Sequence, residues 1–299
     1  MQHDAVMRSH RRIRRALALV VLAWLAGLLS PAADATEQSL QVGRLHVVVW
    51  TPDTAGPGPW PVVVFSHGLY MCADRSRFLT KALAAAGYLV IAPNHADAHC
   101  SVLDYDLPDP SRLALKPAAI WTDSDYRDRA DDIRSVIDAL RDDPRFRGKA
   151  DLSRLALAGH SLGGYTVLGL GGAWPKWRLP GVKAILALAP YTLPFWRTRG
   201  LRKLQAPVMY EAGMLDPVFT PPLLGWGGAF DRSPTPKYYV EIEDASHYAW
   251  IDPAGLGENV IVAYAVAFLD RYLKGAPESP VLRTRQRGVA VFRRDVRRK

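Results

Sequence analysis

A serine held between glycines directly after a short apolar run is the feature that most restricts the fold of this chain. The run and the serine stand in LALAGHSLGG, residues 155–164, and a stretch rich in small residues follows. The apolar run is typical of a buried strand, and the small-residue stretch is typical of a closely packed helix. Gly159 and Gly163 leave room for a sharp turn in which Ser161 is both exposed and rigid. The pattern predicts a nucleophilic serine at the tip of a strand.

Short apolar runs alternate with helical patterns along the rest of the chain. We expect strands over residues 41–51 and in VVVFSHG, YLVIAP, LALAGHS, VKAILALAP, PVMYEAG and KYYVEIED. Helical spacing appears in RFLTKALAAAGY, which Gly87 ends, over residues 125–140, after Ser161, and in VIVAYAVAFLDRYL. Most of the strands are continuously apolar, which indicates burial on both faces. The fold class is therefore α/β, with a mostly parallel sheet and helices on both of its faces.

The length and composition of the chain allow one large core. The chain has 299 residues, of which 49% are hydrophobic and 22% charged. No internal repeat is evident, and no linker is long enough to divide the central part of the chain. We expect a single α/β domain over residues 36–273.

The first 35 residues have the pattern of a signal peptide. A basic stretch, RSHRRIRR, precedes an apolar run over residues 16–29, and ADA stands before Thr36. The apolar run is shorter than the roughly 20 residues that a membrane span needs, and no later segment is long and apolar enough to span. We expect cleavage after Ala35 and an exported protein, periplasmic or secreted, with no stable membrane span.

The formal charge of +9 is concentrated at the two ends of the chain. Residues 1–35 hold five basic and two acidic residues, residues 274–299 hold nine and two, and the part between holds 24 and 25. The central domain is therefore almost neutral, which argues against a nucleic-acid partner. We interpret residues 274–299 as a solvated basic tail; weak adhesion to anionic surfaces is the alternative.

A serine hydroxyl is a strong nucleophile only when a base removes its proton, so Ser161 requires a histidine that a carboxylate orients. In this architecture the acid and then the histidine follow the serine, each after a later strand. His247 follows KYYVEIED and is the one histidine after Ser161. Asp216 follows PVMYEAG, whereas Asp231 has no strand before it and Asp244 lies too near His247 to come from another strand. We predict a catalytic triad of Ser161, Asp216 and His247.

The same chemistry requires donors for a developing oxyanion. The backbone N–H of Leu162, after the nucleophile, is one candidate, and Leu69, in the loop after VVVFSHG, is the other. His67 stands beside a glycine in that loop, and we expect it to fix the loop through hydrogen bonds. His160 is expected to be a neighbour in the turn and to take no part in the chemistry.

The stretch NHADAHC offers a competing metal site. It holds His95, Asp97, His99 and Cys100, but the glutamate of the H-E-x-x-H pattern is missing and Pro93 disfavours a helix. We expect no metal and interpret the stretch as a loop that lines the active-site cleft. The chain has two cysteines, Cys72 and Cys100, and export to an oxidising compartment makes them a disulfide candidate.

These motifs resemble those of the α/β-hydrolase superfamily. PWPVVVFSHGL, GYLVIAPNHAD, GHSLGG, GMLDP and ASHY are similar to bacterial serine esterases related to platelet-activating-factor acetylhydrolase and to polyester-degrading cutinase-like enzymes, from about Val62 to Leu273. Dienelactone hydrolases share the frame but use cysteine as nucleophile. The H-G-G-G motif of many lipases is absent, because HGLY has one glycine. The resemblance implies the α/β-hydrolase fold and a cofactor-free hydrolase of carboxylic esters.

The loops suggest the kind of ester. Aromatic residues are dense between Ala189 and Trp250, and part of this set would wall an apolar acyl or aryl site: Tyr191, Phe195, Trp196, Phe219, Trp226, Tyr248 and Trp250. Tyr70, Tyr191 and Tyr248 are the predicted substrate contacts. We expect a small-molecule or polymeric uncharged ester of short to medium acyl or aryl type. Acyl transfer by the same triad and a non-catalytic binding module are the alternatives, and the oligomeric state is left open.

Overall fold

One sheet organises the residues that the computed structural model describes, namely 35–53, 56, 58–100, 117–253, 255 and 257–296. Within these ranges it has nine strands in the order β1-β2-β4-β3-β5-β6-β7-β8-β9. The strands are β1 (Ala35–Val42), β2 (Leu45–Pro52), β3 (Trp60–Ser66), β4 (Leu89–Pro93), β5 (Ala150–His160), β6 (Val182–Leu188), β7 (Val208–Gly213), β8 (Lys237–Ile242) and β9 (Val289–Asp295).

The centre of the sheet is parallel and its margins are antiparallel. β3 pairs in parallel with β4 and β5, and the parallel pairing continues through β6, β7 and β8. β1, β2 and β9 pair antiparallel with their neighbours. Every residue of β3, β4 and β7 is buried, as their continuous apolar runs predict. The expected mostly parallel sheet is confirmed.

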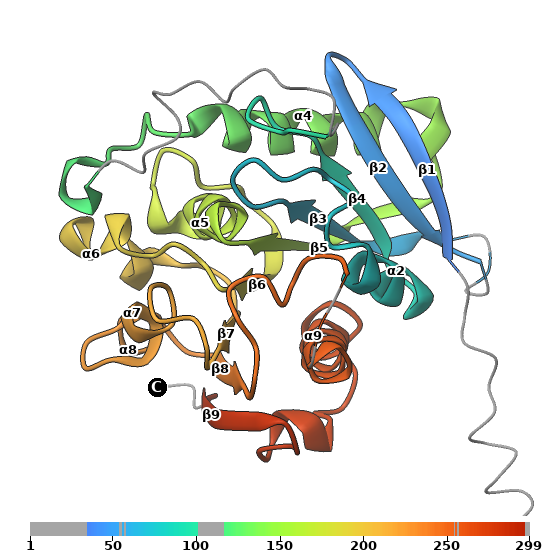
Figure 1. The fold of residues 1–299 in the computed structure, drawn as a ribbon. Helices are drawn as coiled ribbons and strands as arrows, with labels where there is room; N and C mark the ends of the chain where they lie inside the picture. The colour runs from blue at the N-terminus through green and yellow to red at the C-terminus, as the bar shows by residue number, and fades with distance from the viewer. Residues whose placement is uncertain are drawn as a thin grey trace, which may run out of the picture. The chain divides into compact units, whose positions relative to one another are not determined.

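Helices cover both faces of the sheet (Figure 1). The helices are α2 (Arg77–Ala85), α4 (Arg127–Asp142), α5 (Leu162–Leu168), α6 (Pro194–Thr198), α7 (Pro221–Leu224), α8 (Ala229–Arg232) and α9 (Glu258–Leu273), and short turns lie at η1 (Ala118–Ile120), η2 (Pro144–Phe146), η3 (Gly169–Ala173), η4 (Gly200–Lys203) and η5 (Pro280–Leu282). α4 and α5 contribute to the core on one face, and α2 and α9 to the core on the other. Two apolar layers therefore enclose the parallel strands.

The strand predicted over residues 41–51 is confirmed as β2 from Leu45 onward, but residues 41 and 42 belong to β1, a preceding strand that was not predicted. β1 ends at Val42, and β2 begins at Leu45 and pairs back along it. Gly43 has a φ of +54°, a conformation that glycine adopts without a steric penalty. The polar positions of β1 hid it, because an edge strand buries too little to need an apolar run.

The domain does not end at Leu273, which corrects the predicted boundary of a solvated tail at residues 274–299. β9 pairs with β8, and Leu282 and Val289 are buried against the layer that contains α9. Two arginines of β9 form ion pairs, Arg293 with Asp231 and Arg294 with Glu278. The basic composition concealed a strand in which the apolar stretch VAVF supplies the packing.

The predicted signal peptide falls outside the described residues, apart from Ala35 at the start of β1. Within the described ranges, no helix is long and apolar enough to cross a membrane.

Candidate active site

The predicted serine, acid and histidine meet beyond the carboxyl ends of three parallel strands. Ser161 follows β5 directly, Asp216 lies three residues beyond β7, and His247 lies five residues beyond β8. The residues are far apart in the chain, and the parallel arrangement of the strands brings their ends to one edge of the sheet.

Ser161 occupies a strained turn between β5 and α5. Its φ of 54° and ψ of −113° are unfavourable for a residue with a side chain, and strain of this kind concentrates at functional sites. The turn persists because its surroundings hold it: the Ser161 N–H donates to the Leu188 carbonyl at 2.9 Å. A Cβ atom at Gly163 would lie 1.9 Å from the Ser66 carbonyl oxygen, so this position admits glycine alone. The G-x-S-x-G spacing therefore has a steric cause.

A chain of hydrogen bonds joins the three side chains. His247 Nδ1 lies 2.7 Å from Asp216 Oδ2, and His247 Nε2 lies 2.9 Å from Ser161 Oγ. An ionised carboxylate only accepts, so Nδ1 carries the proton and Nε2 is left to accept the hydrogen of the serine hydroxyl. This tautomer is the one that a general base needs.

Asp216 is held in its ionised form. Burial by itself would raise its pKa, but hydrogen bonds from His247 and from the backbone N–H groups of Phe219 and Val218 outweigh burial and lower the pKa. The N–H groups of Phe219 and Val218 donate to Oδ1 at 2.9 and 3.2 Å, which leaves Oδ2 for His247. The turn after Asp216 thus orients the carboxylate toward the histidine.

His160 supports the loop that carries His247. Its Nε2 lies 2.9 Å from the His247 carbonyl oxygen, so Nε2 is the donor. Burial, together with the nearby His247, lowers the pKa of His160 to about 3, which keeps its ring neutral. Its hydrogen bond to His247 is to the backbone, its ring packs at 5.0 Å from the His247 ring, and the expectation of a neighbour in the turn stays a prediction.

A cleft of about 310 Å³ lies over Ser161. Its lining includes the predicted residues Leu69, Tyr70, Leu162, Tyr191 and Tyr248, together with Gly68, Met71, His160, Phe219 and His247. Leu69 lies on the loop after β3, and Leu162 is the first residue of α5. Neither backbone N–H donates to another described residue, which leaves both available to a bound oxygen.

The predicted aromatic wall divides into cleft, core and surface. Phe195 and Trp250 are fully buried, whereas Trp226 is fully exposed. Phe219, an aromatic candidate outside the three predicted substrate contacts, lines the cleft, and its ring stacks on His247. Met71 was missed altogether; its position two residues after Leu69 was the one available signal.

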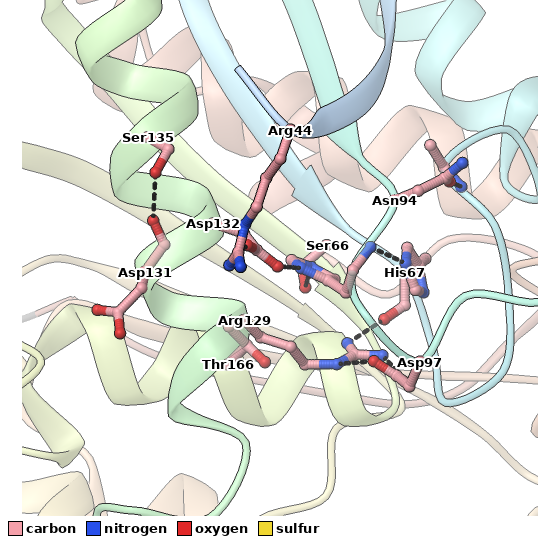
Figure 2. A network of polar contacts seen from close by, with 12 residues as sticks. Arg44, Ser66, His67, Asn94, Asp97, Arg129, Asp131, Asp132, Ser135 and Thr166 are labelled. Atoms are coloured by element: carbon pink, nitrogen blue, oxygen red, sulfur yellow. Dashed lines mark hydrogen bonds and ion pairs between the residues drawn. The ribbon is translucent and has the colours of Figure 1, made fainter. Parts of the chain in front are cut away.

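The stretch NHADAHC, residues 94–100, does not line the cleft, contrary to our expectation. His95 and Asp97 are buried, at 3% and 2% exposure, behind the loop that carries Leu69. His95 lies between Ser66 Oγ, 2.9 Å from its Nε2, and Asp132 Oδ2, 3.0 Å from its Nδ1. Figure 2 shows this cluster, to which α4 contributes Asp132, bonded to His95, and Arg129, bonded to Asp97. Asp132 and Arg129 of α4 bind His95 and Asp97 of this loop, and the apolar spacing that predicted the helix did not indicate these contacts.

A disulfide joins the loop of the oxyanion candidate to the loop after β4. Cys72 and Cys100 are bonded, with 5.4 Å between their Cα atoms. His99 packs edge-on against Tyr70, at 5.2 Å between ring centroids.

In the described part of the chain no group of three or more His, Cys, Asp or Glu side chains is arranged to hold a metal ion.

Comparison with known proteins gives the same fold. Residues 37–123 match the family model of platelet-activating factor acetylhydrolase, isoform II. The chain has the α/β-hydrolase fold. This hydrolase-fold chain is 29% identical over 150 residues to cutinase est2 of Thermobifida alba and to cutinase 2 of Thermobifida cellulosilytica. These matches cover 48% of the chain, and 45% and 52% of the two relatives, so the chain spans about half the length of the relatives it matches.

Proposed function

We propose that the protein is an exported serine esterase that cleaves uncharged carboxylic esters through an acyl-enzyme on Ser161. The observation that carries the proposal is the continuous hydrogen-bond chain from Asp216 through His247 to Ser161. The matches to a platelet-activating factor acetylhydrolase family and to cutinases support the same reaction class.

The chemistry follows from the positions of the protons. Ser161 Oγ attacks the ester carbonyl carbon while its proton passes to His247 Nε2, and the N–H groups of Leu69 and Leu162 stabilise the resulting oxyanion. The ester C–O bond then breaks, and the leaving alkoxide takes the proton from His247. Water enters next and loses a proton to His247 as it attacks the acyl-enzyme. Collapse of this second intermediate returns that proton to Ser161 Oγ and releases the acid.

The cleft favours an uncharged ester of short to medium acyl or aryl type. Among its described lining residues none is lysine or arginine, so no cation is placed to pair with a carboxylate or phosphate of the substrate. Tyr191, Phe219 and Tyr248 offer ring faces and edges to an apolar group. In residues 191–236, all of which are described, the longest helix is α6 with five residues, too short for a helical lid.

Export rests on the leader pattern of residues 1–35 and on the two cysteines. The Cys72–Cys100 disulfide fits an oxidising compartment, because such bonds are rare where thiols are kept reduced.

The test combines covalent labelling with a substrate series. A fluorophosphonate probe should label the wild-type protein and fail to label Ser161→Ala, and peptide mapping should place the adduct on Ser161. Among p-nitrophenyl esters of increasing length, kcat/KM should peak at short to medium acyl chains. Absence of labelling, or activity that rises steadily toward long-chain esters, would refute the proposal. Recovery of the exported protein without residues 1–35 would support cleavage of the leader.

A further inference from the structure

The carbonyl oxygen of Gly68 accepts hydrogen bonds from three directions. The donors are His67 Nδ1 at 2.7 Å, Arg129 Nη2 at 3.1 Å and the Met71 N–H at 3.2 Å. His67 Nε2 accepts from the His95 N–H at 3.0 Å, so Nδ1 carries the ring proton and is the donor. Gly68 immediately precedes Leu69, the oxyanion candidate, so the bonds that hold the Gly68 carbonyl also hold the peptide group that contains the Leu69 N–H.

Arg129 extends from α4 toward His67 and Asp97 (Figure 2). Its side chain is fully buried and makes a two-point ion pair with Asp97, Nε to Oδ1 at 2.9 Å and Nη2 to Oδ2 at 2.6 Å. Nη1 also donates to the His67 carbonyl at 2.7 Å, and Nη2 also donates to the Gly68 carbonyl. A buried arginine is costly unless it is paired and hydrogen-bonded, and here Asp97 and two loop carbonyls accept four hydrogen bonds from its five N–H groups.

The planarity of the peptide bond links this pair to the cleft. In a trans peptide the carbonyl and the following N–H point in opposite directions, and the Gly68 carbonyl and the Leu69 N–H belong to one such plane. A carbonyl drawn toward Arg129 therefore turns the Leu69 N–H away from Arg129, toward the cleft that Leu69 lines with Ser161.

We propose that Arg129, oriented by Asp97, is a positioning residue that fixes the Gly68–Leu69 peptide and so aims the oxyanion donor of Leu69. The inference rests on the proposed esterase function and adds a device outside the triad. The geometry requires arginine, because lysine ends in a single nitrogen that cannot bind both carboxylate oxygens of Asp97 and two carbonyls in a fixed plane.

The test compares Arg129→Lys with Arg134→Lys. Arg134 is a half-buried arginine of the same helix, and it too donates to a backbone carbonyl, that of Trp177, away from the cleft. We expect Arg129→Lys to lower kcat by about tenfold or more, up to the roughly 10²–10³-fold that loss of one oxyanion donor causes, with KM nearly unchanged. The rate of fluorophosphonate labelling should fall by a similar factor. The pH midpoint of kcat/KM should not move, because the Asp216–His247 pair is untouched. Arg134→Lys should match the wild type in all three.

A general loss of structure would change KM and the pH profile together with kcat, and that result would overturn the proposal, as would wild-type kinetics in Arg129→Lys. A wild-type protein that the probe fails to label would instead refute the esterase function itself. The crystal structure of phosphonylated wild type provides a readout that needs no variant. We expect the phosphonyl oxygen to accept from the Leu69 N–H while the Gly68 carbonyl stays on Arg129. A flipped Gly68–Leu69 peptide, or an oxygen bound by other donors, would contradict this assignment.

Discussion

The ring of Phe219 stacks on the imidazole of His247, with 4.1 Å between their centroids and 23° between their planes. The backbone N–H of the same Phe219 donates to Asp216 at 2.9 Å. Phe219 therefore holds Asp216 by its main chain and covers a face of the His247 ring by its side chain. The aromatic ring limits how the imidazole can tilt between Asp216 and Ser161.

Removal of this ring should slow the reaction and leave the protein folded. We expect Phe219→Ala to lower kcat/KM for a short p-nitrophenyl ester by about tenfold, because the imidazole loses its stacking partner and reacting groups tolerate little misplacement. Phe219→Leu, which keeps an apolar cover, should retain more activity. Equal kinetics in wild type and Phe219→Ala would show that the stack does not position His247.

Asp216→Asn should reduce kcat by about four orders of magnitude, because the amide can donate to Nδ1 and so favours the wrong tautomer of His247. Steady-state kinetics against the same ester measures the loss, and circular dichroism checks the fold. Asp231→Asn, at the aspartate excluded from the triad, is the matched control and should retain nearly full activity. The reverse ranking of the two variants would assign the acid to Asp231.

Glu211 should make stability depend on pH. Its side chain is fully buried in β7, and burial, against the hydrogen bond from Trp250, raises its pKa to about 8 from an ordinary value of 4.5. Between these two values the unfolded chain loses a proton that the folded protein keeps, so the free energy of unfolding falls as pH rises. Above about pH 8 both states are ionised and the contribution levels off.

We therefore expect Glu211→Gln to be more stable than the wild type at pH 8, with a difference that shrinks toward pH 4.5. The slope removed should be at most about 1.4 kcal/mol per pH unit. Denaturant unfolding across this range measures it, and Glu243→Gln, at an exposed glutamate, should keep the wild-type slope. A pH-independent difference between Glu211→Gln and wild type would rule out this titration.

Loss of the disulfide should destabilise the protein by about 3–4 kcal/mol, the entropy expected for a link across 28 residues. The double variant Cys72→Ser/Cys100→Ser tests this by denaturant unfolding. Wild type under reducing conditions should resemble the variant, whereas the variant itself should not respond to reductant. Two free thiols in the denatured, unreduced wild type would show that the bond does not form.

Leu282→Ala tests whether the C-terminal segment belongs to the domain. Leu282 is completely buried, and its truncation should cost about 2–5 kcal/mol through lost burial and the cavity left behind. Arg287→Ala, at an exposed position of the same segment, should change stability little. If both substitutions were neutral, the packing of Leu282 would contribute nothing to the stability of the domain.

The sequence by itself determined the fold class and identified Ser161 as the candidate nucleophile. Continuous apolar runs specify strands buried on both faces, and the glycines around Ser161 specify a turn that larger residues would block, so these features are written in local patterns. His247 and Asp216 followed because the chain has a single later histidine and each residue stands just after an expected strand. Such inferences need neighbours in the chain and no knowledge of distant contacts.

Only the tertiary structure decided which polar residues meet. The approach of Arg129 to Gly68 joins α4 to the loop after β3, and β9 completes the sheet beside β8 although its composition is that of a solvated tail. Phe219 and Met71 line the cleft, whereas Phe195 and Trp250 lie in the core. The physical reason is that burial and hydrogen bonding between distant segments depend on which strand ends are adjacent, and strand order is set by the packing of the whole domain.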